Sequence, residues 1–570
     1  MKKSLLALLL VLAMMLGLFA GCGTEASTAE ESTAAASEST AAAAPEAEEE
    51  EAAEPAAEAE GSAAEAAPVE AADEGRVAPE VTYPLVEETT TLTYWQAWPP
   101  FLNEISAPSD AAMFAALEEI TGIKLEITAV STETSADDFM LRCASMDLTD
   151  MIQKACDSYT GGGAKAIEDE IIIDLLEPIT EYSVNYYDIM MSDENIYKNV
   201  LNDEGQIPQF IGMYTDYYYT DQGFWVRQDI LDAVGKEVPT TVSELDEVLA
   251  AFKDHGLTDG LVVLSQGNCD LLARAYGAVD TMNEDGTVNF TARSEEYKAY
   301  LQKMNEYYNL GYINVDFITY TDSDTKPPED VIYSDNGGFF NEDVASISGY
   351  YSTTTNPDFE LAPVGQIRLN EGDVLDYGYI GVKTADKYAL SISTQCENVD
   401  LAVQYMDYLF SDEGFLLSNY GIEGETYTAE NGEYQFTDLI LNNPQGFDWQ
   451  LCQSLYINPG FPCLTDLTIE QMTYNDAQKS AVSTWVAAYD SSDATVPTAS
   501  WLSYTTEESE ERADVQTDIE TYQEEMRLKF ITGQADIDAE WDTYVETLES
   551  MGIDILEETY QASVDRYNSK

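Results

Sequence analysis

Residues 91–130 read TLTYWQAWPPFLNEISAPSDAAMFAALEEITGIKLEITAV. The stretch opens with an alternating strand pattern at 91–95, and a helical pattern follows at 113–121. Gly122 stops that helix, and a second strand pattern occupies 123–130. An alternation of strand, helix and strand indicates a parallel α/β layer.

The same alternation recurs further along the chain. It includes a helix near 136–145, a short strand at 151–152, a strand at 223–226 and a helix that opens at 227–231. Thr241 followed by Glu244 forms a capping box, which predicts a helix over 242–255. From 507 onward the pattern is predominantly helical. The folded part is therefore predicted to be a large α/β protein with a helical C-terminal part.

The turn sequence at 283–287 predicts a hairpin between two apolar stretches. It carries too few correctly spaced oxygen ligands for a calcium loop. The chain has a single histidine, His255, in the Lys-Asp-His-Gly context of a helix C-terminus. No catalytic triad of ordinary form and no histidine-rich zinc site is expected, and we predict neither catalytic nor metal-binding residues.

The acidic charge extends beyond the N-terminal region into the folded part. The formal net charge is −82. Without residues 1–80 the chain keeps 90 acidic and 22 basic residues, a net charge of −68. A field of this sign repels nucleic acid and anionic membranes, so we expect no nucleic-acid partner. Solubility outside the cell is the simplest use of such a charge.

The first residues have the organisation of a secretory signal. Lys2 and Lys3 precede an apolar run that ends near Ala20. Residues 18–22, Leu-Phe-Ala-Gly-Cys, resemble the lipobox of bacterial lipoproteins, although Phe19 stands where the pattern prefers an aliphatic residue. The resemblance implies removal of residues 1–21 and acylation of Cys22, which would hold the protein on the membrane by lipid alone.

Residues 22–80 form the predicted linker. From residue 24 it consists almost entirely of Ala, Glu, Ser, Thr and Pro, with 17 acidic residues, one basic residue (Arg76) and no aromatic residue before residue 80. Such a segment cannot bury enough apolar surface to offset its chain entropy, and we expect it to be disordered. A charged linker would keep a domain away from the membrane.

Six cysteines remain besides Cys22, and none forms a CxxC pair. A domain of this size does not need disulfides, and most of these cysteines have contexts typical of buried small residues. Only Cys452 and Cys463 are close enough in sequence to suggest a local bridge, and whether they form one is left open.

Several segments are similar to the extracellular solute-binding proteins of carbohydrate ABC importers, in the maltose-binding-protein superfamily. The branch with the most similar motifs is that of the large oligosaccharide-binding lipoproteins of Gram-positive bacteria. The matching pieces are 141–152, 166–169, 173–175, 225–231 with 238–241, 337–340, 420–427, 530–534, 551–553 and 560–562. They occur in the expected order over residues 88 to 565. Family members commonly have Gly and Pro in one loop where this chain has Met146 and Thr149.

The resemblance implies an α/β, two-lobed periplasmic-binding-protein-like fold of type II with a multi-strand hinge. We expect residues 81–215 with 388–425 in the first lobe, and 216–387 with 426–570 in the second. Chain crossings are expected near 213–222, 379–391 and 422–434. The implied partners are an oligosaccharide and the permease subunits of an ABC transporter, and we expect a monomer without cofactor at the outer face of a Gram-positive membrane.

Candidate ligand contacts follow from sugar chemistry, which calls for aromatic platforms and planar polar groups. The aromatic candidates are Trp95, Trp98, Trp225 and Trp501, although a tryptophan is more often a core residue. The polar candidates are Asp157, Asn341 and Glu342, each placed where a strand ends or a cleft is expected.

The alternative function is a surface hydrolase that acts on carbohydrates through paired carboxylates. With 90 acidic residues in the folded part, such pairs occur by chance and carry no information. The order of hinge-like segments favours ligand capture over hydrolysis.

Overall fold

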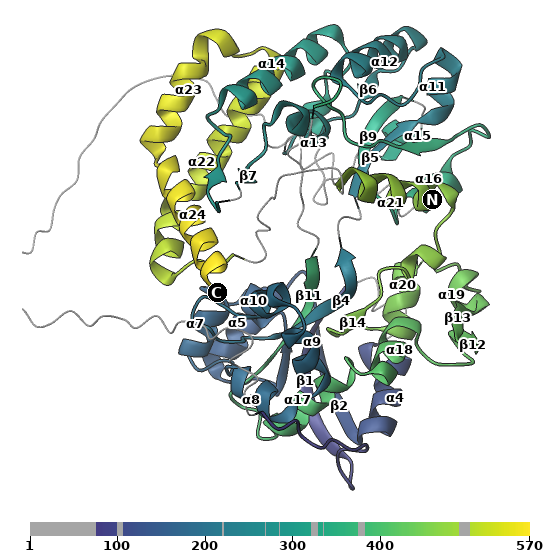
Figure 1. Cartoon of the computed structure of the whole chain (residues 1–570), viewed down its shortest axis with the longest axis vertical. Coiled ribbons are helices and arrows are strands. Elements are labelled where there is room, and N and C mark those ends of the chain that lie inside the picture. Colours follow the sequence, from purple (N-terminus) through teal and green to yellow (C-terminus); the bar gives the residue numbers. More distant parts are fainter. Residues whose placement is uncertain are drawn as a thin grey trace, which may run out of the picture. The chain divides into compact units, whose positions relative to one another are not determined.

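The computed structural model describes residues 76–99, 107–218, 222–267, 269–283, 285–320, 329–333, 336–373, 382–447, 449–489 and 502–570. Two main β-sheets organise this part of the chain (Figure 1). Cys22, Trp501 and the linker up to residue 75 lie outside the described residues. None of the described helices is long and apolar enough to cross a bilayer.

The first half is built on a six-stranded sheet in the order β14-β4-β11-β3-β1-β2. Its strands are β1 (Thr90–Trp98), β2 (Ile123–Ser131), β3 (Met151–Gln153), β4 (Phe210–Tyr218), β11 (Val382–Ile392) and β14 (Leu464–Thr465). Alternation along β1 divides its side chains between two apolar clusters, with Tyr94 on one face and Trp95 on the other. The helices that follow these strands include α4 (Ala112–Thr121), α5 (Ser135–Ser145), α6 (Ala155–Ser158), α7 (Gly162–Glu168), α8 (Leu176–Tyr182), α9 (Asn185–Met191), α10 (Glu194–Val200), α17 (Val399–Tyr408) and α18 (Asp412–Tyr420).

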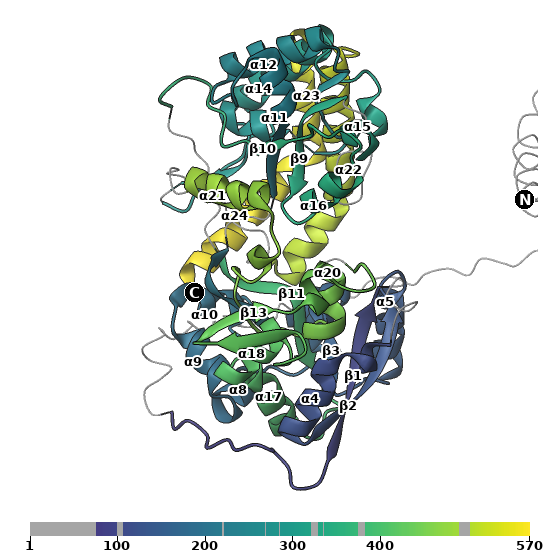
Figure 2. The same ribbon diagram turned by 90° about the vertical axis from the view of Figure 1, so that its right-hand side faces the viewer.

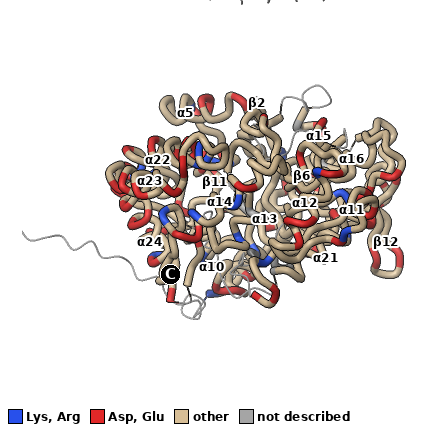
Figure 3. The backbone as a smooth tube through the Cα atoms, turned by 90° about the horizontal axis from the view of Figure 1, so that it is seen from above, with Lys and Arg blue, Asp and Glu red and all other residues tan. Residues whose placement is uncertain are grey.

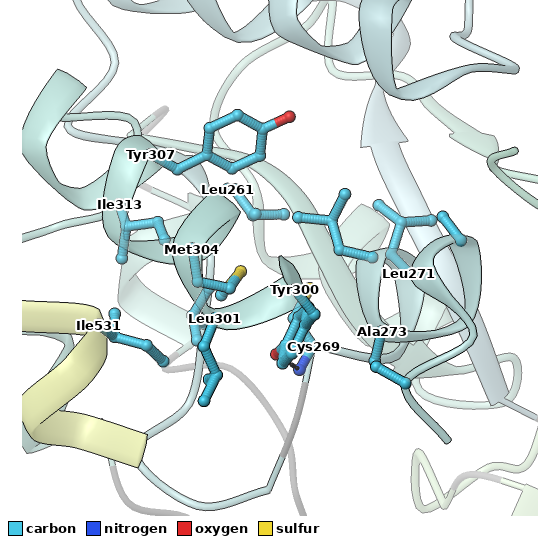
Figure 4. Close-up of a cluster of buried hydrophobic side chains, with 14 of the residues drawn as sticks. Leu261, Cys269, Leu271, Ala273, Tyr300, Leu301, Met304, Tyr307, Ile313 and Ile531 are labelled. Carbon is cyan, nitrogen blue, oxygen red and sulfur yellow. Dashed lines mark hydrogen bonds between the residues drawn. The ribbon is translucent and has the colours of Figure 1, made fainter. Parts of the chain in front are cut away.

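The second half is built on a four-stranded sheet in the order β10-β5-β9-β6. Its strands are β5 (Gln222–Arg227), β6 (Asp259–Leu261), β9 (Gly337–Asp343) and β10 (Leu361–Pro363). The helices of this half include α11 (Gln228–Val234), α12 (Val242–His255), α14 (Glu295–Leu310), α15 (Glu329–Tyr333) and α16 (Ile347–Thr353). Its largest apolar cluster joins α12 and α14 to the sheet and to the C-terminal helices, and Figure 4 shows part of it around Tyr300 and Met304.

The C-terminal helices are α21 (Asp476–Tyr489), α22 (Thr506–Thr532), α23 (Ile537–Met551) and α24 (Ile553–Ser569). α21 packs on β10, and α22 packs on α14. These contacts connect the end of the chain to the second half, and Figure 2 gives a second view of them. Acidic residues occur along both halves and the C-terminal helices, with fewer basic residues among them (Figure 3).

Most locally determined elements match their predictions. The capping box of Thr241 and Glu244 starts α12, which ends at His255 before Gly256 as expected. The predicted hairpin is the pair β7 (Thr281–Met282) and β8 (Val288–Asn289). The helical C-terminal part is also confirmed.

The predicted third crossing is wrong. Its segment contains the hairpin of β12 (Tyr427–Glu430) and β13 (Glu433–Phe436), and the chain then returns to the first sheet as β14. The passage to the second half follows β14, before α21. A two-residue strand that pairs with a partner about 250 residues earlier leaves no local pattern, and sequence periodicity therefore misses it.

Candidate ligand-binding site

The parallel strands of the first sheet end along one edge. β1 is parallel to β3, and both β3 and β4 are antiparallel to β11, so β1, β3, β4 and β14 share one direction. We call the carboxyl ends of these strands the first edge. Ligands of open α/β sheets bind outside such edges.

Two glutamines at the first edge form hydrogen bonds to a loop that is distant in the sequence. Gln96 Nε2 donates to the carbonyl oxygen of Pro459 at 2.5 Å, and Gln153 Nε2 donates to that of Gly460 at 2.9 Å. A Cβ atom at Gly460 would lie 3.0 Å from Gln153 Nε2 and 3.1 Å from Gln96 Nε2, with φ at +114°. Only glycine fits this close approach without strain. Asn458 holds the loop by accepting from the backbone N–H groups of Gly460 and Phe461.

Two polar atoms of the first edge are buried without a partner. Among the residues that the structure describes, neither Gln96 Oε1 nor Trp98 Nε1 has a hydrogen-bond partner. Gln96 and Trp98 are 1% and 2% exposed, and two residues apart on a strand they share one face. An acceptor and a donor on one face of β1 are thus buried without a partner among the described residues. Buried polar groups in proteins are almost always paired, so this pair requires an explanation.

Trp95 points to the other face of β1, where its indole N–H has a hydrogen-bond partner. Its Nε1 donates to Asp138 Oδ2 at 2.8 Å, and Arg142 Nε donates to the same oxygen at 2.6 Å. Partial burial of Asp138 opposes ionisation, but the two hydrogen bonds outweigh it and hold the pKa of this carboxyl below its usual value. Trp95 is 2% exposed and packs against Phe139.

Asp157 lies in α6, directly after β3. Its carboxylate is 3.4 Å from Lys154 Nζ, and both side chains are more than two-fifths exposed. The position at the carboxyl end of β3 is the one that the sequence predicted. Its side chain is accessible, and the surface ion pair with Lys154 is weak enough to rearrange.

The second sheet has a corresponding edge, the second edge, at the carboxyl ends of β6, β9 and β10. Glu342 near the end of β9 is 2% exposed. Its Oε2 accepts from the Tyr350 hydroxyl at 2.7 Å, and its Oε1 accepts from the Asp343 N–H at 2.9 Å. Asp343 in turn accepts from the N–H and hydroxyl of Ser346. The carboxylates of Glu342 and Asp343 therefore accept hydrogen bonds from residues of the second half itself.

Trp225 occupies the interior of the second half. It is wholly buried, its Nε1 donates to the Glu342 carbonyl oxygen at 3.3 Å, and its ring meets Trp485 edge to face with the ring centroids 5.4 Å apart. A Cβ atom at Gly223 would lie 2.3 Å from the Trp485 ring, so this glycine permits the contact. Asn341 is partly exposed on the neighbouring strand, in register with Phe224.

The structure thus brings Trp98 together with Gln96 and Gln153, and Trp225 together with Glu342. The sequence analysis missed the two glutamines. A usable signal was present, because each is a polar residue at the end of an apolar strand pattern. Whether the seven predicted contact residues touch ligand stays a prediction.

No disulfide joins any two of the described cysteines. Cys452 Sγ lies near the carbonyl oxygens of Leu439 and Phe447, whereas Cys463 Sγ lies near Asn458 and Thr465, so the two do not form the local bridge considered from sequence. No group of three or more His, Cys, Asp or Glu side chains suited to a metal ion occurs within the described ranges.

Residues 103–414 match the family model of the bacterial extracellular solute-binding proteins. The chain belongs to this family. Lipoprotein LipO of Bacillus subtilis (strain 168) is 25% identical over 364 residues, which cover 60% of this chain and 69% of LipO. The fructooligosaccharide ABC transporter substrate-binding protein FusA of Streptococcus pneumoniae serotype 4 is 23% identical over 523 residues, covering 86% of this chain and 92% of FusA.

Solved structures show the same fold. FusA in complex with kestose aligns with a TM-score of 0.64 at 18% identity and covers 84% of this chain and 100% of that one. The alginate-binding protein AlgQ2 aligns with a TM-score of 0.63 at 20% identity, covering 85% and 100%. The predicted two-lobed solute-binding fold is confirmed, and membership of a family of binding proteins argues against the hydrolase alternative.

Proposed function

We propose that this protein is a lipid-anchored extracellular solute-binding protein that captures an oligosaccharide and delivers it to the permease of an ABC transporter. It acts as a monomer and catalyses no reaction. The observation that carries the proposal is the pair of buried polar atoms without a partner among the described residues, Gln96 Oε1 and Trp98 Nε1, at the first edge.

A sugar hydroxyl matches this pair chemically. A hydroxyl donates one hydrogen bond and accepts others, whereas a carboxylate can only accept. Gln96 Oε1 requires a donor and Trp98 Nε1 requires an acceptor, and hydroxyl groups can supply both. The net negative charge of the folded part also favours a neutral ligand over an anionic one.

The predicted contact set divides into two groups. We assign Trp98, Asp157 and Asn341 to ligand contact, keep Trp501 as a prediction from the sequence, and add Gln96. We assign Trp95, Trp225 and Glu342 to the support of the two edges, because their polar groups are engaged by neighbouring residues. The proposed lobes follow the predicted boundaries, except that residues 426–465 are placed in the first lobe.

The names of the relatives support an oligosaccharide ligand. FusA is a fructooligosaccharide-binding protein, and the Bacillus subtilis relative YtcQ is a polygalacturonan/rhamnogalacturonan-binding protein that is 22% identical over 371 residues. AlgQ2 is an alginate-binding protein. These ligands differ in charge and linkage and share a chain of sugar rings, which is the ligand class that we propose.

A glycan panel tests the proposed function. Purified protein is mixed with neutral and acidic oligosaccharides, thermal stability is recorded, and the sugars are then analysed for cleavage. A bound glycan at a hundredfold excess over its Kd stabilises the protein by about 2.7 kcal/mol. Stabilisation with intact sugar supports capture. Cleaved sugar, or no stabilisation by any glycan, contradicts it.

The lipid anchor is tested separately through Cys22. Expression in a Gram-positive host with a labelled fatty acid should label the wild type and leave Cys22→Ser unlabelled. The wild type should sediment with membranes, because more than one acyl chain gives durable anchoring. An unlabelled wild type would remove the anchor from the proposal while leaving the ligand function untouched.

A further inference from the structure

Arg76 is the one basic residue of the predicted linker, and it is docked on the first half. Its side chain is only 7% exposed. The guanidinium lies 3.5 Å above the centre of the Tyr187 ring, a cation–π arrangement. Asp188, exposed on the same helix α9, has its carboxylate 3.7 Å from Arg76 NH1.

The same guanidinium caps helix α8. Its Nε donates to the Thr180 carbonyl oxygen at 3.0 Å, and its NH2 donates to that of Ser183, the residue that caps the helix. The last carbonyl groups of a helix have no partner within the helix, and a cation there also complements the helix dipole. Arg76 therefore binds a surface made from the end of α8 and the start of α9.

From Arg76 the chain runs toward the start of the first sheet. The Tyr83 ring packs edge to face on Tyr408 at the end of α17, with the ring centroids 5.0 Å apart. The Leu85 N–H donates to the Thr121 carbonyl oxygen, and the Thr90 N–H to that of Gly122, next to the first residue of β2. Figure 2 shows this dark segment passing below the sheet beside α8 and α17. It follows the amino ends of the strands, away from the first edge.

The distribution of charge explains why one basic residue, Arg76, is enough to fix the linker to the folded part. The segment before Arg76 carries 16 acidic residues and no basic one from residue 24 onward, and the folded part is itself acidic. Like charges keep the two apart. Arg76 is the only basic residue that residues 24–80 can offer to the acidic folded part.

We infer that the surface formed by the end of α8 and the start of α9, here called the α8–α9 surface, is the docking site of the linker. Arg76 is the residue that docks there, and the linker that it attaches is called the tether below. The tether is thereby attached to the first half at the side away from the first edge. The biological meaning of this site rests on the proposed membrane anchor, whereas the docking itself does not.

The tether is long enough for this exit. Between Cys22 and Arg76 lie 53 residues. A flexible chain of that length spans about 40 Å on average, and charge extends it further. A domain of about 490 residues has a radius of gyration of about 23 Å. The domain can therefore turn its ligand-binding edges toward a permease although the tether starts elsewhere.

Trypsin tests the docking directly, because Arg76 is the only Lys or Arg between Lys3 and Lys124. A docked arginine must first detach before the protease can bind it, so cleavage follows the detached fraction. In the full-length Ala71→Arg variant, the new bond after residue 71 lies before the contacts described for Arg76 and serves as the internal control. We expect cleavage after Arg76 to be slower than cleavage at the control bond by about tenfold or more.

Two further variants separate docking from local sequence. Asp188→Lys, at an exposed position, places a like charge beside Arg76 and should bring the two cleavage rates together. Tyr187→Leu removes the ring under the guanidinium and should do the same, with protection at Lys124 confirming that the domain is folded. Equal rates at both bonds in the Ala71→Arg chain, or slow cleavage after Arg76 that neither further variant accelerates, would overturn the inference. Loss of the acyl group alters neither rate, so a failed anchor is distinguished from failed docking.

Discussion

The two edges occupy equivalent positions at the carboxyl ends of strands, yet their polar groups are used differently. At the first edge, Gln96 Oε1 and Trp98 Nε1 are buried with no partner among the described residues. At the second edge, Glu342 receives hydrogen bonds from Tyr350 and Asp343, and the Trp225 indole donates to a carbonyl oxygen. The second edge satisfies its own polar groups and acts as a support, whereas the unpartnered groups of the first edge are the ones that we propose for ligand contact. Substitutions at the two edges should therefore change different quantities.

The largest effect is expected for Trp225→Ala. The side chain is wholly buried against Trp485, and replacing a buried tryptophan by alanine costs about 3–5 kcal/mol of unfolding free energy. Urea unfolding measures this loss. Ile318→Ala, at a residue that is 46% exposed in the same half, is the control and should change stability by less than about 0.5 kcal/mol. A loss at Trp225 as small as at the control would remove it from the supporting core.

Glu342→Gln should have the second largest effect. The amide keeps the shape but turns an N–H group toward one of two donors, the Tyr350 hydroxyl or the Asp343 N–H. A mismatched buried group of this kind costs about 1–3 kcal/mol. Tyr350→Phe removes the same hydrogen bond from the other side. In a double-mutant cycle the two changes should couple by about 0.5 kcal/mol or more, and strictly additive effects would contradict the contact.

Trp98→Phe tests the open edge. It removes an N–H that has no protein partner, so stability should change little beyond the lost ring area, while affinity for the bound glycan should fall by roughly fivefold to tenfold, the value of one hydrogen bond. Trp485→Phe is the matched control, since its Nε1 already donates to the Val364 carbonyl oxygen. That variant should lose stability and keep affinity. Calorimetric titration of both variants with the bound glycan measures their affinities. Equal losses of affinity in the two variants would contradict the proposed difference between the edges.

The sequence predicted what depends on neighbours in the chain. The boundaries of α12 follow from a capping box and a terminal glycine, both of which are local. The hydrogen bonds at the first edge join Gln96 to Pro459 across 363 residues and Gln153 to Gly460 across 307. Sequence periodicity cannot predict contacts between residues so far apart in the chain.

Aromatic residues were also harder to assign than strands. Trp95, Trp98 and Trp225 look alike as sequence, and only the structure distinguishes an indole that reaches a carboxylate from one left open. In the same way, Arg76 was expected in the linker because composition describes a segment on average and does not reveal a single docked residue.

The smallest effect is expected within β1 itself, where Trp95 and Trp98 face opposite sides. The Trp95 indole and Arg142 hold the pKa of Asp138 below its usual value, near 3.9 in an unfolded chain. The folded carboxylate binds its proton less readily than the unfolded one. Its contribution to stability is therefore present above the unfolded pKa and is lost as pH falls through the folded pKa.

Trp95→Phe removes one of these hydrogen bonds, so the difference in unfolding free energy between the wild type and this variant should shrink as pH is lowered from 7 toward 3. The pH-dependent part should stay below about 1 kcal/mol, because the carboxylate is partly solvated. Trp98→Phe, two residues further along β1 with no carboxylate on its Nε1, should show a difference that does not change with pH. Urea unfolding at several pH values measures both. If the Trp95→Phe difference were equally constant, Asp138 would not be the acceptor that distinguishes the two faces of the strand.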